Sequence, residues 1–453
     1  MTREDLLASL RTALSQSGAP GFAALVDQVH PADLALALRD VEADELHRLL
    51  LTVAPDPLAR LYGYLEPAQQ AEVALRMDRI GRIELLERLS ADDRADLYNT
   101  LPEDAREALM PALAQADRED IVRLAAYPEG TVGALMTSEY ALLHPDLNAR
   151  EAVEHLRREA PDKETIYHAY VVDPQRRLLG VVSLRDLIVA AATTNVETLM
   201  TRDVVSVQAN APVREAIKAI DHYDLLAVPV TDDGHALVGI VTVDDVLDSA
   251  EDEATEDFHK GGGSLPLKST SLLGASTWLL YRKRVFWLVV LVFGNLLSSA
   301  GIAHFEDIIA NYIALVFFLP LLIGSGGNAG SQASTLMVRS LATGDVRMRD
   351  WGRMLGREFA VAALLGLTMA VAVAPIGIYR GGHEIALTTS LSMVLIVLTG
   401  SIVGMSLPFL LSRLRLDPAT SSAPLITSIC DAIGVVIYLS IAVAVLGVPA
   451  VDG

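Results

Sequence analysis

Residues 308–338 read IIANYIALVFFLPLLIGSGGNAGSQASTLMV, a run of 31 residues without one charged side chain. About 20 predominantly apolar residues are enough for a helix to cross the hydrocarbon core of a bilayer. The glycine-rich segment Gly324–Gly330 lies in the middle of this run. We therefore expect a membrane span that is broken at these glycines, where freed backbone carbonyls could line a protein-buried cavity.

Four further apolar stretches extend this interpretation to the whole second half of the chain. They are Val285–Ala303, Phe359–Ile378, Ile385–Leu411 and Pro418–Val451. The pattern predicts an all-α transmembrane domain of five helices over residues 271–453, embedded in a lipid bilayer.

Basic side chains gather on one set of the connections between these spans. They are Arg282, Lys283 and Arg284 before the first span, Arg339, Arg347, Arg349, Arg353 and Arg357 between the second and third, and Arg413 and Arg415 between the fourth and fifth. Lys and Arg mark the cytoplasmic side of membrane proteins. Residues 1–20 also lack the apolar core of a signal peptide. We expect a multi-pass protein of the cell (inner) membrane with a cytoplasmic N-terminus and an external C-terminus.

The charge of the chain is divided as unequally as its hydropathy. The 453 residues carry a formal charge of −21 at a mean hydropathy of +0.36. Residues 1–260 hold 48 acidic and 24 basic side chains, whereas residues 261–453 hold 9 and 12. This division excludes a single globular enzyme, and the acidic half excludes a nucleic-acid partner, which needs a basic face. The one cysteine, Cys430, excludes an internal disulfide and a Cys-based zinc site.

Residues 1–130 are typical of an acidic, α-helical superhelical domain made of short helix pairs. Ser90-Ala91-Asp92-Asp93 and Leu101-Pro102-Glu103-Asp104 resemble helix N-termini, where acidic residues are favoured by the helix dipole. Most acidic residues of this domain fit a solvated surface.

Residues 131–249 contain an internal repeat that alternates short strands with helices. Leu135-Met136-Thr137 recurs as Leu199-Met200-Thr201, and Gly180-Val181-Val182-Ser183-Leu184-Arg185-Asp186-Leu187 recurs as Gly239-Ile240-Val241-Thr242-Val243-Asp244-Asp245-Val246. The repeat resembles a tandem CBS pair of α/β fold. No catalytic constellation accompanies it, so we do not expect an enzyme.

The CBS resemblance implies an adenine-nucleotide site at the Gly-x-Val-Ser/Thr-x-x-Asp turn. In the first repeat Ser183 would face phosphate, Asp186 would bind ribose, and Arg185 would attract phosphate. In the second repeat, Asp244 would repel it. The alternative is that Asp186 only caps a helix that starts at Leu187.

The segment 250–270 joins the two halves as an acidic connecting helix and linker. Asp245, Asp248, Asp252 and Glu256 recur at helical spacing and lie on one face. One interpretation is a solvated acidic helix with Gly261–Ser264 as a hinge. The other is a set of divalent-cation sites that docks the helix and the neighbouring domains when occupied, since hard cations take carboxylate oxygens. The helix would then act as a gate.

Asp431 is the only acidic residue within the predicted spans. A lone aspartate at that depth costs about 2.5–3.5 kcal/mol on the insertion scale, so it should face a wet interior and mark an ion path. The alternative is a protonated Asp431 that is hydrogen-bonded between helices. Asn328 and Gln332, four residues apart beside Gly326 and Gly327, could join it.

The order of these parts resembles the MgtE family of Mg²⁺ channels, related to the solute carrier 41 proteins. The residues that carry the resemblance are Glu253-Ala254-Thr255-Glu256-Asp257, the Pro320–Gly330 segment and the span of Asp431. It implies a homodimer whose pore holds hydrated Mg²⁺ at Asp431, with the backbone near Thr427 beside it. It also implies closure by cytosolic Mg²⁺ at the acidic positions Asp224, Asp245, Asp248, Glu253, Glu256 and Asp257, and Asp92, Asp93 and Asp96 are further candidates in the N-terminal domain.

Two positions depart from that family's pattern. Acids are expected near Pro212 and Arg214, and an Asn is expected where Ala423 stands. The first departure bears on the number of sensing ions, and the second bears on coordination at one mouth of the pore.

The sequence therefore predicts passive uptake of Mg²⁺, for which a potential of 100 mV supplies about 4.6 kcal/mol per dication. Mg²⁺ is expected as both cargo and regulator, with ATP as a further candidate modulator. The alternatives are a transporter of Mn²⁺ or Co²⁺, an ion-coupled Mg²⁺ exchanger, and a non-conducting, membrane-anchored sensor of metal or nucleotide.

Overall fold

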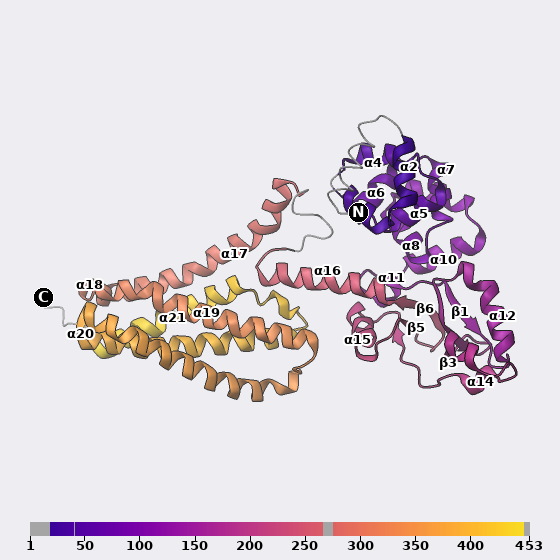
Figure 1. Cartoon of the computed structure of the whole chain (residues 1–453). Helices are drawn as coiled ribbons and strands as arrows, with labels where there is room; N and C mark the ends of the chain where they lie inside the picture. The colour runs from indigo at the N-terminus through magenta and orange to yellow at the C-terminus, as the bar shows by residue number, and fades with distance from the viewer. Residues whose placement is uncertain (1–18, 40, 266–274, 448–453) are drawn as a thin grey trace. The chain divides into compact units, whose positions relative to one another are not determined.

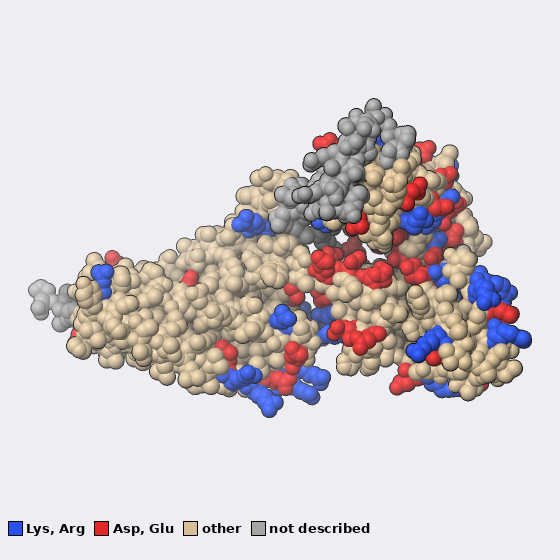
Figure 2. Space-filling model, in the orientation of Figure 1, with Lys and Arg blue, Asp and Glu red and all other residues tan. Residues whose placement is uncertain are grey.

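The computed structural model describes residues 19–39, 41–265 and 275–447. The ends of the predicted domains at residues 1–18 and 448–453, and the linker residues 266–274, lie outside the described residues. The chain divides into two compact units, residues 1–252 and 253–453, and each unit is described by itself below. Charged side chains cover the first unit, whereas the second is largely uncharged (Figure 2).

The first domain is a stack of short helices, as the sequence predicts. They are α2 (Ala19–Gln28), α3 (Pro31–Leu38), α4 (Ala43–Leu50), α5 (Pro55–Gly63), α6 (Pro67–Arg76), α7 (Arg79–Leu86), α8 (Ala91–Thr100), α9 (Glu103–Leu109), η1 (Met110–Ala112) and α10 (Gln115–Ala125). Most of them pack on the helix two places further along the chain, as α3 does on α5 and α6 on α8. Prolines at the first turns of α3, α5 and α6 help to set where these helices begin.

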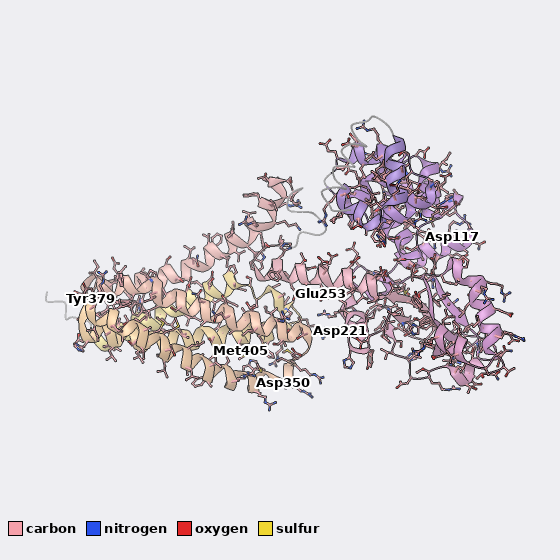
Figure 3. All side chains as sticks on the ribbon, in the orientation of Figure 1. Asp117, Asp221, Glu253, Asp350, Tyr379 and Met405 are labelled. Atoms are coloured by element: carbon pink, nitrogen blue, oxygen red, sulfur yellow. The ribbon has the colours of Figure 1, made fainter. Side chains whose placement is uncertain are left out.

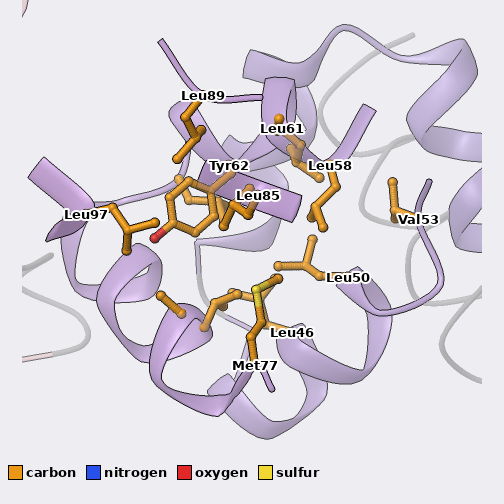
Figure 4. Packing of buried hydrophobic residues seen from close by; sticks show 14 of the residues in the cluster. Leu46, Leu50, Val53, Leu58, Leu61, Tyr62, Met77, Leu85, Leu89 and Leu97 are labelled. Atoms are coloured by element: carbon orange, nitrogen blue, oxygen red, sulfur yellow. The ribbon is translucent and has the colours of Figure 1, made fainter. Parts of the chain in front are cut away.

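The core of this domain is aliphatic and forms between successive helices. Leu46, Leu50, Leu61 and Leu85 are buried around Tyr62, whose hydroxyl donates to the backbone carbonyl of Gln70 at 2.8 Å (Figure 4). The predicted starts of α8 after Ser90 and of α9 after Pro102 are both confirmed.

The internal repeat forms two three-stranded sheets with the same topology. The first contains β1 (Tyr140–Leu143), β2 (Thr165–Val172) and β3 (Leu178–Ser183), and the second contains β4 (Val207–Gln208), β5 (Ala227–Thr231) and β6 (Leu237–Thr242). In each sheet the first two strands are parallel and the last two antiparallel. The helices are α11 (Val132–Leu135), α12 (Ala149–Glu159), η2 (Ala160–Asp162), α13 (Leu184–Val189), α14 (Val196–Leu199), α15 (Val213–Tyr223) and α16 (Val243–Gly261).

Each half of the repeat packs on the other through its repeated motif. A methyl group on Gly180 would lie 2.7 Å from the sulfur of Met200, and one on Gly239 would lie 2.7 Å from that of Met136. The Leu-Met-Thr motif of one half therefore packs on the glycine of the other half's last strand. This exchange explains why both motifs occur twice.

The second unit is a helical bundle. Its elements are α17 (Thr277–His304), α18 (Glu306–Asn311), α19 (Ala314–Thr343), η3 (Met348–Asp350), α20 (Trp351–Arg413), η4 (Pro418–Thr420) and α21 (Ala423–Leu446). Among the described residues, four helices are long and apolar enough to cross a membrane. α19, α20 and α21 pack together, whereas α17 packs mainly on α21 and is otherwise exposed (Figure 1).

α20 contains two of the five predicted spans and folds back on itself. Its backbone is non-helical at Gly382, where φ is 78° and ψ is −171°. Beyond this break the two halves lie against each other, since a methyl group on Gly377 would lie 2.6 Å from Cα of Ala386.

The prediction that the glycine-rich run breaks its span is wrong. α19 is helical from Ala314 to Thr343, and the interruption falls instead before it, at Tyr312 and Ile313. The glycines serve close helix packing, because Gly326 and Gly330 lie directly against Gly400 and Gly404 of α20. Small residues four apart are the usual means by which membrane helices approach closely.

Candidate cation sites

Asp431 lies on α21, half-buried, eight residues after the helix begins at Ala423. The helix approaches α19 closely at this level, because Gly327 faces Thr427 and Gly330 faces Cys430. The Thr427 hydroxyl donates to the Pro424 carbonyl at 2.9 Å, so this side chain is engaged with its own helix. The structure thus brings Thr427, Gly327 and the turn of Asp431 to one helix–helix contact.

Asn328 and Gln332 lie on a different face of α19 from these glycines. Both side chains are exposed in the single chain, whereas Gly326, Gly327 and Gly330 are buried. No hydrogen bond joins either amide to Asp431 within the described part of the chain. A stripe of amides on an apolar helix therefore remains open to a ligand, to water or to a second copy.

Only Asp431 was expected as an acid within the spans, and the structure places Glu358 inside a long apolar helix as well. Glu358 lies inside α20, whose helix begins at Trp351, seven residues before the position of this acid. The predicted span began one residue later, at Phe359, because Arg353 and Arg357 lower the hydropathy there. The buried face shared with Ala362 and Gly366 could have revealed it.

The first unit holds an acidic interface between the helical domain and the CBS pair. Ala91 and Ala95 of α8 pack into the hydrophobic cluster of the second CBS repeat. Asp92 and Asp93 of α8 thereby come within electrostatic reach of Asp244 and Glu164. One carboxylate oxygen of Asp92 is buried without a hydrogen-bond partner.

The carboxyl groups of this interface hold their protons far more tightly than isolated ones. Burial, and then the charge of Asp92, raise the pKa of Asp93 to about 6. Burial raises the pKa of Asp245 to about 7, against a 2.6 Å hydrogen bond from the Thr242 hydroxyl, and Asp92 adds to the rise. Surrounding protein and the charge of Asp92 raise the pKa of Asp96 and of Glu164 to about 7 as well. These shifts reflect the burial of the acids and their mutual repulsion.

One arginine offsets part of this charge. Arg94 is buried and pairs with Asp117 of α10 at 3.2 Å and with Glu139, which precedes β1. The sequence analysis missed Arg94 because its partners lie 23 and 45 residues away. Within the described residues, the acidic interface included, no three His, Cys, Asp or Glu side chains are already arranged to hold a metal ion.

The acids of α16 divide between two environments. Asp248 and Glu253 are exposed on the helix, and Figure 3 labels Glu253. Near the end of α16, Lys260 bridges Glu256 at 2.6 Å and Asp417 at 2.5 Å. Burial and the charge of Asp417 raise the pKa of Asp257. The structure therefore links this end of the helix to the segment just before α21.

Asp224 has a structural position that the sequence did not reveal. It ends α15 in the left-handed conformation, with φ of 51°. Its side chain is exposed. Its role in sensing stays a prediction.

The two Gly-x-Val-Ser/Thr-x-x-Asp turns share one geometry. The Ser183 hydroxyl donates to Asp186 at 2.6 Å, just as Thr242 does to Asp245. The helix start predicted at Leu187 is wrong, since α13 begins at Leu184 and Ser183 caps it by accepting from the backbone N–H of Asp186. Arg185 is exposed beside this turn.

The architecture defines a class of protein: an acidic helical domain and a CBS pair that lead through a single helix into a membrane-type bundle. Comparison with family models gives the same division. Residues 29–130 match the MgtE intracellular N domain, residues 132–193 and 196–252 match CBS domains, and residues 319–441 match MgtE, described as a divalent cation transporter.

Relatives of similar length match along the whole chain. It is 40% identical to the magnesium transporter MgtE of Thermus thermophilus, covering 97% of this chain and 98% of that one. It is 30% identical to that of Bacillus subtilis, with 98% of each chain covered. The chain therefore belongs to the MgtE family.

Solved structures of cytosolic parts agree with the fold. The cytosolic domain of the Mg²⁺ channel MgtE in complex with ATP is 36% identical, with a TM-score of 0.51, over 54% of this chain and 99% of that chain. The soluble part of a magnesium transporter is 30% identical, with the same TM-score, over 56% of this chain and 100% of that chain.

Proposed function

We propose that this protein is a Mg²⁺-selective channel or transporter that admits Mg²⁺ down its electrochemical gradient and closes when cytosolic Mg²⁺ binds. The observation that carries the proposal is Asp431, an acid within an apolar bundle, in a chain that matches magnesium transporters over 97% of its length. An acidic residue inside a membrane span is a candidate for an ion pathway, because placing a carboxylate in the bilayer costs free energy that only a function would justify.

The pore is proposed to lie on the axis of a homodimer. Asn328 and Gln332 are exposed in the single chain, and amides that face lipid are costly. A second copy would turn them toward a shared water-filled path. Two Asp431 carboxylates on that axis would repel each other unless a dication lay between them. After α17 the chain would cross the membrane four more times: once in α19, once in each half of α20, and once in α21. The total is five crossings.

The cargo is proposed to pass with water still bound. Mg²⁺ dehydrates reluctantly and usually keeps several waters, so the carboxylates and nearby carbonyls would recognise the hydrated ion. The membrane potential drives the movement of the ion. The protein would lie in the cell (inner) membrane with its acidic unit in the cytoplasm and its C-terminus outside, because the basic residues gather on the connections of the cytoplasmic side.

The acidic interface is proposed to be the sensor. Asp92, Asp93, Asp96 and Asp245 repel one another across the contact between α8 and the CBS pair. Mg²⁺ would neutralise them and hold that contact closed. Asp248, Glu253, Glu256 and Asp257 would extend the response along α16, with Asp224 as a further candidate.

ATP is a proposed modulator at the first CBS turn. Ser183 and Asp186 have the geometry of a nucleotide turn, and Arg185 stands free beside it for a phosphate. A similar cytosolic domain was solved in complex with ATP, which supports the assignment for this chain.

The test is Mg²⁺ flux into liposomes that carry the full chain, with low and then millimolar Mg²⁺ on the side of residues 1–260. We expect flux at low Mg²⁺, suppression at millimolar Mg²⁺, and loss of flux in Asp431→Ala with the dimer intact. Normal flux from that variant would exclude Asp431 from the pore. Competition by Mn²⁺ or Co²⁺ would favour a transporter of those ions. Dependence on a Na⁺ or H⁺ gradient would favour an ion-coupled Mg²⁺ exchanger. No flux at all would favour a non-conducting sensor.

A further inference from the structure

Glu358 is a carboxyl group inside the first half of α20, and the proposed function makes no use of it. It lies one turn before Ala362 and two turns before Gly366 on α20. Side chains four residues apart share a helix face. Ala362 is fully buried, and Gly366 packs on Val394 of the second half of α20. Glu358 therefore faces the seam between the two halves of α20.

The residue opposite Glu358 follows from the pairing of these halves. The Ser390 hydroxyl lies 3.4 Å from the Ala370 carbonyl, and Gly366 lies against Val394. The two halves run antiparallel, so the same register places residue 358 opposite the turn of Ser401. Ser401 is 1% exposed. Its hydroxyl is the polar side-chain group that interacts with the Glu358 carboxyl as a hydrogen-bond donor. The Ser401 hydroxyl is left without a well-formed hydrogen bond.

An apolar layer separates this pair from the nearer ends of the helices. Met337, Met405 and Phe409 are buried there, and Met354 and Leu355 of the first half of α20 pack against them. Glu358 follows Met354 by one turn, so its carboxyl group lies behind this layer.

Charged neighbours do not compensate Glu358 within the described residues. The charged side chains on the elements packed around it are Arg339 on α19, Arg347, Arg349 and Asp350 on or beside η3, Arg353, Arg357, Arg380, Glu384 and Arg413 on α20, and Asp431 on α21. None of them forms an ion pair with Glu358 or is among the groups that act on its carboxyl. A carboxylate without a base behind an apolar layer is strongly disfavoured.

We propose that Glu358 and Ser401 form a proton-binding site in the membrane unit, separate from Asp431. The Ser401 hydroxyl is placed to donate to one oxygen of the Glu358 carboxyl, and the bound proton occupies the other oxygen. On deprotonation the proton passes to water, and the seam holds an uncompensated carboxylate. A metal ion is a poor occupant because only two side-chain oxygens face each other here, and the helix carbonyls are already hydrogen-bonded.

The proton site is coupled to the pore through α20, and this step of the proposal rests on the proposed function. The second half of α20 holds Ser401 toward the seam and Gly400 and Gly404 against α19. A charge in the seam would draw in water and shift this half of α20, and with it the helix that carries Asn328. Mg²⁺ flux should therefore depend on whether Glu358 is protonated.

A chemical test reads the proton directly and does not depend on flux. Dicyclohexylcarbodiimide adds to a protonated carboxyl in apolar surroundings: the O–H adds across one C=N bond, and nothing leaves. The full chain in liposomes is labelled between pH 5.5 and pH 8.5 and analysed by peptide mass spectrometry. We expect label on Glu358 that falls about tenfold across two pH units around the midpoint of titration. It should persist in Asp431→Asn and extend to higher pH in Ser401→Ala, which removes the donor to the carboxylate.

Absence of label on Glu358 at every pH, or label that does not change with pH, would overturn the proton site. The flux test then examines its consequence. Wild-type Mg²⁺ flux should change with pH over the range in which the label falls, and Glu358→Gln, which is neutral at every pH and close in shape, should give a flat profile. A pH profile in Glu358→Gln equal to that of the wild type would overturn the coupling. If neither protein conducts, the proposed function fails while the labelling result still decides the proton site.

Discussion

Lys260 of α16 and Asp417, 157 residues further along the chain, form an ion pair of 2.5 Å. Lys260 also pairs with Glu256 one turn earlier in the helix. A single ammonium group thus holds two carboxylates beside a third, Asp257, at the point where α16 meets the segment that precedes α21. This pair anchors the end of the proposed gate without any metal ion.

Replacement of Lys260 by Met should weaken that anchor. The acids Glu256, Asp257 and Asp417 would then repel one another, and α16 would leave its docked position more readily. Since the pair is partly exposed, we expect a coupling of about 0.2–1 kcal/mol, which corresponds to a severalfold rise at most in the Mg²⁺ concentration that half-closes the pore. Flux titrations in liposomes measure this shift.

The matched control is Lys218→Met, because Lys218 is an exposed lysine on α15 that forms no ion pair with any of the described residues. It should leave the titration unchanged. Asp417→Asn combined with Lys260→Met should cost less than the two changes added separately. Equal shifts in the Lys260 and Lys218 variants would show that the ion pair does not hold the gate.

The acidic interface should make the stability of the first unit fall as pH rises. Burial raises the pKa of Asp245 and of Glu164 to about 7 from values near 4 in the unfolded chain. Between these values the folded protein binds more protons than the unfolded protein, so unfolding becomes easier with increasing pH. Without Mg²⁺, the unfolding temperature should decrease from about pH 4 to about pH 7 and then level off.

Mg²⁺ should reverse this trend, because it replaces the protons as the source of positive charge. Asp92→Asn combined with Asp245→Asn should flatten both the pH dependence and the response to Mg²⁺. A scanning calorimetry series on the full chain provides the measurement. Stabilisation by Mg²⁺ that is undiminished in the double variant would place the sensing ions elsewhere.

Much of this arrangement could be predicted from the sequence, and the failures share one cause. Local signals identified the start of α8 after Ser90 and the repeated turns at Ser183 and Thr242, since caps and turns depend on residues close together. Arg94 and Asp417 escaped because their partners lie far along the chain. The Gly324–Gly330 run was misinterpreted because glycine permits both a break and a close helix contact, and only the opposing glycines distinguish them.

Glycine packing gives a third prediction that separates these two roles within one helix. A methyl group on Gly330 would lie 2.7 Å from the Gly400 carbonyl, so Gly330→Ala forces α19 and α20 apart. Such overpacking costs about 1–3 kcal/mol. The yield of folded protein by size-exclusion chromatography should decrease, and thermal unfolding should occur at a lower temperature.

Gly324→Ala is the control, because nothing lies within 4 Å of a methyl group at that position. Alanine is the better helix former by about 1 kcal/mol, so this variant should be as stable as the wild type or more stable. Loss of folded protein in Gly324→Ala would mean that the run needs glycine for flexibility.

The last prediction concerns the two CBS turns, which share a hydrogen-bond geometry but differ in charge. Arg185 is free beside Ser183 and Asp186, whereas Asp244 stands at the corresponding place in the second turn, where Asp245 already belongs to the acidic interface. ATP should therefore bind at the first turn alone. Arg185→Ala removes a charged contact with phosphate and should weaken ATP binding by about 1.5–3 kcal/mol, a factor of at least tenfold in equilibrium dialysis. Thr242→Ala, which alters the second turn in a comparable way, should leave ATP affinity unchanged. If Thr242→Ala weakens ATP binding and Arg185→Ala does not, then charge repulsion does not govern the choice between the turns.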